Sequence, residues 1–423
     1  EALEKENPDW NFEKVKAQSA EAWNNLLSRI DVSGTEEQKV NFYTSIYHLC
    51  IQPNNITDVD GRYRGPNDSI LYSPIGEYYS TLSLWDTYRA AHPLYTLLVP
   101  EKVNGFVNSM LSHCDTQGYL PIWALWGKEN HCMIGNHAIP VIVDAYLKGY
   151  KGFDPERAYE AIRKSSLESH PKSDWETYNQ YGYYPFDLIP EESVSRTLES
   201  CYDDYCVAQM AKALGKKEDY NFFSQRARAY TSLFDPVTKL MRGKDSQGKW
   251  REPFDPFRLS HAGTSGGDYT EGNAWQYVWH VQHDVDSLIE MMGGNKAFTA
   301  KLDSLFWLEN NTVNTGFVSD VTGLIGQYAH GNEPSHHVAY LYNYAGEFWK
   351  TQKLIREIFD HFYLPVSDGL CGNDDCGQMS AWYLFSAMGF YPVDPISKEY
   401  IIGAPQLKEM ILRLEGGKNF IIR

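Results

Sequence analysis

The chain lacks the features that mark several large classes of protein. It contains no run of eighteen apolar residues, so no segment is predicted to span a membrane. No block of five or more Lys or Arg occurs, and the formal net charge is −17. This charge argues against a nucleic-acid partner, because phosphate binding needs a basic face. No repeat of about 34–45 residues emerges, which disfavours an α-solenoid.

Cysteine is also scarce. The seven cysteines among 423 residues are an odd number, so the chain is not a disulfide scaffold. Cys371 and Cys376 are spaced so that a zinc site or a local disulfide could be considered, but no CxxC or HExxH motif accompanies them. We therefore expect buried free thiols.

The given sequence does not open with a signal-peptide pattern. The chain starts with the acidic, helix-like stretch EALEKENPDWNFEKV and ends with MILRLEGGKNFIIR, which alternates like a strand hairpin. We expect both ends to be boundaries within a longer polypeptide.

Aromatic residues are abundant, at 14% of the chain with 12 Trp and 30 Tyr. Two interpretations fit this composition. One is an aromatic-rich core. The other is a cleft whose aromatic side chains stack on pyranose rings, and position along the chain must decide between them.

Helical periodicity recurs almost throughout the sequence. About a dozen helices joined as hairpins predict a mainly α protein, an (α/α)6 barrel rather than a four-helix bundle. The expected helices are 12–30, 36–51, 82–98, 102–115, 134–149, 155–168, 192–214, 217–233, 272–292, 296–309, 335–345, 347–362 and 377–389.

The pattern changes near residue 394. Residues 1–393 are predicted to form a helical domain, and residues 394–423 to form strands that belong to a neighbouring sheet outside this chain. Three long loops interrupt the helices, at 54–81, 170–190 and 236–270. Loops of this length in a compact domain are usually functional.

Five stretches combine Trp or His with acids and amides near a helix start. In an (α/α)6 barrel, alternate helix N-termini meet at one end, where their positive dipoles can hold carboxylates and metal ligands. The stretches are SLWDTYRAAHP (83–93), LPIWALWGKENHCMIGNHA (120–138), GDYTEGNAWQYVWHVQHD (267–284), GNEPSHHVAYLYNYAG (331–346) and GNDDCGQMSAW (372–382).

Carboxylates open two of the expected helices. Glu271 begins one, and Asp374 and Asp375 precede another about a hundred residues later. Such acids are often only helix caps, but a sugar hydrolase needs two carboxyl groups of this kind. Trp275 follows Glu271 and could provide an apolar wall that raises the pKa of its carboxyl.

Hard oxygen ligands occur in GNEPSHH. Asn332 and Glu333 lie directly before Pro334, which suits the first position of a helix. Their oxygens would suit Ca²⁺. A capped helix with a buried histidine is the alternative interpretation of this motif.

The motifs at 267–284, 331–346 and 372–382 together resemble glycoside hydrolase family 92, the calcium-dependent exo-α-mannosidases that invert anomeric configuration. SLWDTYRAAHP and GYYPFDLIPEESVSRTLESCYDDYC are similar to the same family. The resemblance runs from about residue 12 to the end. It implies an (α/α)6 catalytic domain preceded by an N-terminal β-sandwich on which the strands of 394–423 would pack. It also implies a mannose-containing glycan as substrate and export by a bacterium to the periplasm or beyond.

The same resemblance implies residue roles. Glu271 would be the general acid, and Asp375, assisted by Asp374, the base. Asn332, Glu333 and Gln276 would be Ca²⁺ ligands. Residues implied to contact the sugars, with His330 in a leaving-group subsite, are Trp85, Asp86, Trp126, Lys128, Glu129, Trp275 and His330.

Two alternatives stay open at this point. A different inverting (α/α)6 glycosidase would share the carboxylates without needing calcium, and a glycan-binding protein without activity would share the aromatic residues. Among mannosidic linkages, α-1,2 is the one favoured here.

Overall fold

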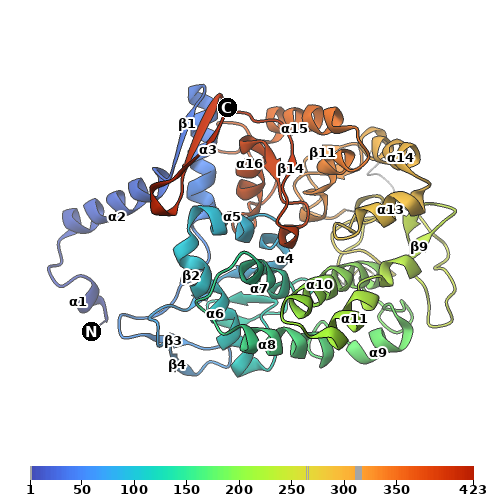
Figure 1. The fold of residues 1–423 in the computed structure, drawn as a ribbon, viewed down its shortest axis with the longest axis horizontal. Helices are drawn as coiled ribbons and strands as arrows, with labels where there is room; N and C mark the ends of the chain where they lie inside the picture. Colours follow the sequence, from blue (N-terminus) through green and yellow to red (C-terminus); the bar gives the residue numbers. More distant parts are fainter. Residues whose placement is uncertain (1, 263, 265, 310–316) are drawn as a thin grey trace.

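The structure is a computed structural model that describes residues 2–262, 264, 266–309 and 317–423. Residues 263 and 265, in the predicted loop 236–270, lie outside the described residues. The described chain is mainly helical (Figure 1), which confirms the predicted class. Its α-helices are α1 (Ala2–Glu6), α2 (Phe12–Leu27), α3 (Glu36–Leu49), α4 (Leu84–Thr87), α5 (Ala91–Leu98), α6 (Pro100–Gln117), α7 (Ala138–Leu147), α8 (Pro155–Leu167), α9 (Trp175–Tyr181), α10 (Ser193–Ala213), α11 (Lys217–Arg226), α12 (Ala274–Tyr277), α13 (Val285–Met292), α14 (Asn295–Trp307), α15 (Phe348–Phe362) and α16 (Gln378–Met388).

Short 3₁₀ helices and strands fill the connections. The 3₁₀ helices are η1 (Ala229–Ser232), η2 (Glu333–Ser335), η3 (Val338–Asn343), η4 (Pro395–Ser397) and η5 (Glu415–Gly417). The strands are β1 (Ile30–Ser33), β2 (Asn54–Asn55), β3 (Arg62–Arg64), β4 (Ile70–Tyr72), β5 (Tyr79–Ser80), β6 (Leu82–Ser83), β7 (Trp123–Leu125), β8 (Lys128–Glu129), β9 (Phe234–Asp235), β10 (Leu240–Met241), β11 (Leu324–Ile325), β12 (Tyr328–Ala329), β13 (Phe390–Tyr391), β14 (Ile401–Ile402), β15 (Glu409–Arg413) and β16 (Asn419–Ile422).

Most predicted helices are present, but three differ. The predicted helix 82–98 is broken between α4 and α5, because Pro93 has no N–H and its ring would clash with the carbonyl of Arg89 in a continuous helix. The predicted helix 272–292 is divided into α12 and α13, and 335–345 contains the 3₁₀ helix η3 in place of an α-helix. Within the predicted loop 170–190 lies α9, which Asp174 caps by accepting the N–H of Thr177.

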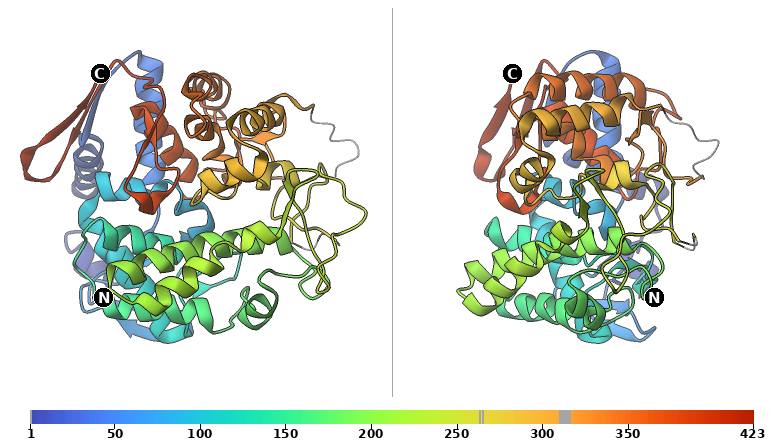
Figure 2. Two further views of the ribbon diagram at one scale, coloured as in Figure 1. Left: turned by 45° about the vertical axis from the view of Figure 1, so that its right-hand side comes forward. Right: turned by 90° about the vertical axis from the view of Figure 1, so that its right-hand side faces the viewer.

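The helices form two layers. Helices of the first half of the chain, in cyan and green in Figure 2, lie below those of the last third, in orange and red. In the lower layer α10 packs against α7, α8 and α11, and in the upper layer α16 packs against α3. The contact of α16 with α5 joins the two layers. The contact between α3 and α16 brings an early helix against the last one, as a closed ring would require. The full (α/α)6 arrangement stays a prediction.

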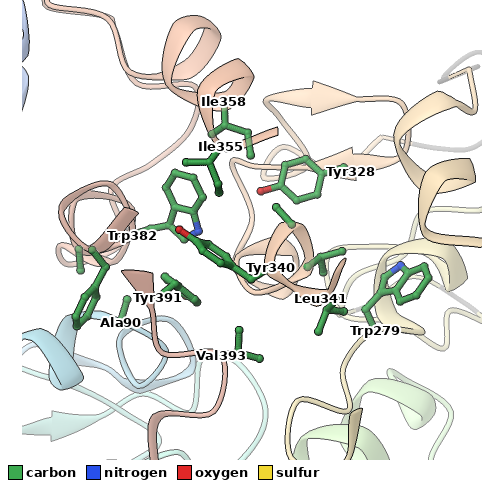
Figure 3. Close-up of a cluster of buried hydrophobic side chains, with 14 of the residues drawn as sticks. Ala90, Trp279, Tyr328, Tyr340, Leu341, Ile355, Ile358, Trp382, Tyr391 and Val393 are labelled. Atoms are coloured by element: carbon green, nitrogen blue, oxygen red, sulfur yellow. The ribbon is translucent and has the colours of Figure 1, made fainter. Parts of the chain in front are cut away.

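The core is rich in aromatic side chains. Trp382 on α16, Tyr340 on η3 and Tyr391 on β13 are buried together (Figure 3), with the rings of Tyr340 and Tyr391 stacked at 5.0 Å between centroids. Much of the aromatic content is therefore structural, which supports the first of the two interpretations of the composition for these residues.

The C-terminal segment forms strands, as its alternating pattern predicts. Strand β15 pairs antiparallel with β1 on one side and with β16 on the other. This three-stranded sheet is visible at the upper left of Figure 1. The association of this segment with a further β-sandwich stays a prediction.

The state of the cysteines and the apolar content of the helices bear on the class of protein. The seven cysteines are free thiols. Among the described residues, none of the helices has the length and apolar content needed to cross a bilayer.

Candidate active site

Three carboxyl groups from distant parts of the chain meet at one point. Asp86 lies on α4, Glu333 begins η2, and Asp375 lies in the loop before α16. An oxygen atom from each lies within 4.8 Å of the others. We refer to Asp86, Glu333 and Asp375 as the acid cluster.

Hydrogen bonds from the GNDDCGQ motif hold these segments together. The side-chain oxygen of Gln378 accepts the backbone N–H groups of Ala90 and Ala91, at 3.0 and 3.1 Å, just after α4. Its nitrogen lies 3.0 Å from Nδ1 of His336, which follows η2. Gln378 therefore fixes the α4 and η2 segments to the start of α16, and so positions all three carboxyl groups.

The backbone at Asp375 is unusual. Asp375, Cys376 and Gly377 have successive positive φ angles of 47°, 55° and 91°. The first two are costly for residues with a Cβ. At Gly377 a Cβ would lie 2.7 Å from Cα of Leu49, so glycine is required for this close approach. The packed turn thus aims Asp375 at the cluster.

Burial and mutual repulsion disfavour the ionised forms of the three carboxyl groups in the acid cluster. Burial, followed by the charge of Asp375, raises the pKa of Asp86 and of Glu333 well above the ordinary range, and Arg89 opposes the shift in both. Burial also raises the pKa of Asp375, to about 6. Three carboxyl groups this close together cannot all be ionised unless a cation offsets their repulsion; without one, some of them stay protonated.

A hard cation fits this cluster. All of its donors are carboxylate oxygens, which suit Ca²⁺ or Mg²⁺. In addition, Oε1 of Glu333 is buried and has no hydrogen-bond partner among the described residues. A buried acceptor without a partner is costly, and a bound cation would satisfy it.

Glu271 lies beside the acid cluster, on the turn that leads into α12. Its φ is 47°, and its carbonyl accepts a 2.7 Å hydrogen bond from the side-chain amide of Asn332. Burial first, then the charges of Asp320 and Asp86, raise the pKa of its carboxyl to about 8. Its side chain remains 11% exposed, and the raised pKa favours the protonated form of Glu271 at neutral pH.

Asp374 has a different task from its neighbour. Its Oδ1 accepts hydrogen bonds from both N–H and Oγ of Ser380, at 2.9 and 2.8 Å. It thereby satisfies a free N–H group in the first turn of α16. Asp374 thus stabilises the helix that follows the turn of Asp375, and its assistance in catalysis stays a prediction.

The hydrogen bonds from Asp374 to Ser380 predict that replacing Asp374 with Ala and with Asn will have different effects. Asp374→Ala should lower the free energy of unfolding by about 0.5–2 kcal/mol because the helix start loses its acceptor. Asp374→Asn keeps an acceptor oxygen and should leave stability and turnover within a few-fold of the parent. Chemical denaturation and steady-state kinetics measure the two effects. Loss of turnover in Asp374→Asn at unchanged stability would return Asp374 to the reaction.

Three residues predicted to contact sugar are buried in the structure. Trp85 is 1% exposed and His330 is 0% exposed, and His330 is held between the hydroxyls of Tyr328 and Tyr363 at 2.8 Å each. Glu129 is also buried. Its carboxylate accepts backbone N–H groups of Ile122, Trp123 and His131. These three side chains face the interior of the described structure, and their contact with sugar stays a prediction.

Other predicted contact residues remain accessible. Trp126 is 56% exposed, at the tip of the β7–β8 hairpin. The ammonium of Lys128 lies 2.7 Å from Asp68. Trp275 is partly buried, and the Nζ atom of Lys301 lies 3.7 Å from the centroid of its ring. Their contact with sugar stays a prediction.

The predicted calcium ligands separate in the structure. Glu333 belongs to the acid cluster, and Asn332 precedes it. Gln276, however, accepts the N–H of Asn273 at 3.0 Å and donates to the carbonyl of Gln327 at 3.1 Å. It closes the capping box of α12, and its role as a calcium ligand stays a prediction.

The sequence alone missed several contributors to the site. Asp86 was assigned to a sugar pocket and not to a metal cluster. The buried cation Arg89 and the loop acid Asp320, which influence the carboxyl pKa values, gave no signal. The one available clue was the position of Arg89 three residues after Asp86, which would place both residues on the same face of a helix.

Comparison with known proteins adds to this geometry. The model of the glycosyl hydrolase family 92 catalytic domain matches residues 1–423. The structure is similar to that of a family GH92 α-mannosidase from Bacteroides thetaiotaomicron in complex with mannoimidazole, with 46% identity, a TM-score of 0.94, and coverage of 99% of this chain and 55% of that one.

Two further proteins are similar. An inverting GH92 mannosidase from Bacteroides thetaiotaomicron VPI-5482 shows 37% identity and a TM-score of 0.87, with 98% of this chain and 57% of that chain covered. An uncharacterized secreted glycosidase of Arthroderma benhamiae is 28% identical over 442 residues, covering 95% of this chain and 50% of that protein. The chain thus spans about half the length of these relatives.

Proposed function

The chain belongs to glycosyl hydrolase family 92, and from this premise we propose that it is the catalytic part of a calcium-dependent, exo-acting α-mannosidase. It would hydrolyse terminal α-linked mannose with inversion at the anomeric carbon. The observation that carries the proposal is the pairing of a buried acid, Glu271, with a cluster of three carboxyl groups.

Glu271 is the proposed general acid. A carboxyl with a pKa of about 8 holds its proton at neutral pH and can give it to a departing oxygen. The proton moves to the glycosidic oxygen as the bond from C1 to that oxygen breaks. The departing sugar then leaves as a neutral alcohol.

Asp375 is the proposed base. It is the one member of the acid cluster that is partly exposed, whereas Asp86 and Glu333 are buried, and a base must reach water. As the water oxygen forms its bond to C1, the water proton passes to the carboxylate of Asp375. Attack from the face opposite the leaving group gives the inverted product, and the relative titled an inverting mannosidase supports this outcome.

Asp86 and Glu333 are the residues proposed to hold Ca²⁺, with Asn332 next to them in the chain. Bound there, the ion would supply a fixed positive charge and coordination sites for sugar hydroxyls. The chain's own contribution is to keep these two carboxylates buried, close together and beside the base.

The remaining parts of the proposal concern the whole protein. A closed (α/α)6 barrel is supported by the contact of α3 with α16. Additional sequence in the same polypeptide is supported by the greater length of the relatives, and export by the secreted relative. That this sequence is an N-terminal β-sandwich rests on family resemblance. A preference for α-1,2 linkages is the most specific part and rests on family resemblance alone.

A chelation experiment tests the cation requirement. Free mannose is measured by chromatography after incubation with α-1,2-, α-1,3- and α-1,6-linked mannobiose, with added Ca²⁺, with EDTA, and with EDTA followed by excess Ca²⁺. We expect release with Ca²⁺, loss with EDTA and recovery on adding Ca²⁺ back. Equal release in all three conditions would contradict the calcium requirement, and release of reducing-end mannose from longer chains would contradict exo action.

Glu333→Gln should separate metal binding from folding. Removing one buried carboxyl lowers the repulsion in the acid cluster, so the melting temperature without metal should rise. Calcium affinity should fall on the order of 10²-fold, because affinity depends on the number of charged ligands, and turnover should fall with it and recover partly in excess Ca²⁺. Calorimetry and thermal melts with and without Ca²⁺ measure these effects. An unchanged Ca²⁺ affinity would place the ion elsewhere.

A further inference from the structure

A second buried network of charged groups adjoins the acid cluster through Trp85, which precedes Asp86 in the chain. Its centre is Glu199 on α10, which is 0% exposed. Oε1 of Glu199 accepts a 3.0 Å hydrogen bond from the indole Nε1 of Trp85. Its Oε2 lies 2.9 Å from Nε2 of His137 and 3.0 Å from Nε2 of His280.

Glu199 therefore accepts one indole N–H and has two imidazole nitrogens in close contact with its other oxygen. His137 also contacts Asp203, with 2.9 Å between Nδ1 and Oδ1. The two carboxylates overcome the effect of burial and raise the pKa of His137 to about 9, so both of its nitrogens carry protons. Burial lowers the pKa of His280, and its Nε2 atom contacts the same oxygen of Glu199 as Nε2 of His137 does.

Each partner of Glu199 comes from a different segment near the proposed site. Trp85 lies on α4 next to Asp86, His137 directly precedes α7, and His280 follows α12. Gly135 is needed for this packing, because a Cβ there would lie 2.2 Å from Nε2 of His137. Glu199 therefore joins three segments at a single carboxylate.

The short helix α4 depends on this anchor more than a longer helix would. It has only four residues, and isolated helices of that length are not stable. Arg89, just beyond it, donates from Nε to the carbonyl of Trp85 at 3.1 Å and lies 3.7 Å from Oε1 of Glu199. Both Trp85 and Arg89 thus connect Glu199 to the backbone that carries Asp86.

We propose that Glu199 is a positioning residue for the proposed calcium site. Its carboxylate holds Trp85 in place, and Trp85 holds Asp86 against Glu333 and Asp375. The inference rests on the proposed function for the identity of the ion, but the positioning of α4 stands on the contacts of Glu199 alone.

Glu199→Gln tests the role, with Asp204→Asn as the matched control. Both residues lie on α10, both are 0% exposed, and both bind buried cationic side chains. Asp204 pairs with Arg226 at 2.6 Å and is not among the described residues that form the acid cluster. The two variants should lose comparable stability, so any further difference between them reports on the site.

Two readouts decide the result. Hydrogen–deuterium exchange should speed up for the amides of 84–92 in Glu199→Gln but not in Asp204→Asn. Calorimetric Ca²⁺ affinity should fall by about 10–100-fold in Glu199→Gln, the range typical when a residue that orients metal ligands is lost, and should stay at the parent value in Asp204→Asn. Trp85→Phe, which removes the same hydrogen bond but keeps a ring, should act in the same direction if Glu199→Gln does not fold.

The outcomes separate this inference from the proposed function. If both variants behave alike in exchange and affinity, Glu199 only stabilises the fold and the inference is overturned. If the parent protein binds no Ca²⁺, the proposed function fails, while the exchange of 84–92 still decides whether Glu199 positions α4.

Discussion

Glu271→Gln should lower the turnover of unactivated α-mannosides by about 10²–10⁴-fold, the usual contribution of a positioned general acid. Aryl mannosides with good leaving groups should lose far less, because their departing oxygen needs little protonation. The physical basis is the burial of Glu271 among other acids, which raises the pKa of its carboxyl to about 8. Steady-state kinetics on the two substrate classes measures the difference.

The pH dependence gives an independent check on the same residue. The acid form of Glu271 is present below its pKa and is lost as the pH rises through about 8. In the parent protein kcat/KM should therefore fall above that pH. Glu271→Gln has no proton to lose and should show no such basic limb. Equal losses on both substrate classes, or a basic limb that persists, would remove Glu271 from the acid role.

Asp375→Asn should lower turnover by about 10²–10⁴-fold on activated and unactivated mannosides alike. Attack by water is common to both substrate classes, and an amide cannot accept the water proton. The base must be ionised, so the parent kcat/KM should also fall as the pH drops below the pKa of Asp375, which burial raises to about 6. Bound Ca²⁺ favours the carboxylate and should move this acidic limb to lower pH.

Asp374→Asn is the control for this variant. The two aspartates are adjacent, yet Asp374 bonds to Ser380 at the start of α16 and Asp375 belongs to the acid cluster. A large loss in Asp375→Asn together with near-parent turnover in Asp374→Asn is the expected result. Rescue of Asp375→Asn by azide with formation of a β-glycosyl azide would strengthen it, whereas a covalent sugar on Asp375 would mean a retaining nucleophile.

The sequence was informative about elements with strong local signals. Helices such as α8 and α10 follow from periodicity and from starts marked by Pro155 or by the polar stretch before Ser193. The convergence of GNEP and GNDD was predicted from their positions at helix starts, and the acid cluster contains Glu333 and Asp375 from those motifs. Local chemistry was sufficient in these cases because each motif opens its own helix.

The direction of side chains could not be read from the sequence. Trp85 and His330 lie in motifs rich in polar and aromatic residues, which are equally typical of a sugar cleft and of a hydrogen-bonded core. Their indole and imidazole groups find partners inside, at Glu199, Tyr328 and Tyr363. Only tertiary packing decides such cases, because both environments satisfy the same donors.

The acid cluster shows the other limit. Asp86 meets Glu333 because Gln378 bonds to the backbone after α4, a contact between segments that are far apart in the chain. No spacing within either segment indicates it. Helix α9, by contrast, could have been predicted from the sequence, because Asp174 and Gly182 supplied the usual capping signals at its two ends.

The anomeric form of the first product tests the central claim most directly. Proton NMR during the first minutes of hydrolysis of an α-mannoside, before mutarotation equilibrates the anomers, identifies the form released. An acid at Glu271 and a base at Asp375 acting through water predict β-mannose as the initial product, in a reaction that depends on Ca²⁺. Initial release of α-mannose would contradict the account, because it would require a covalent intermediate and a different role for Asp375.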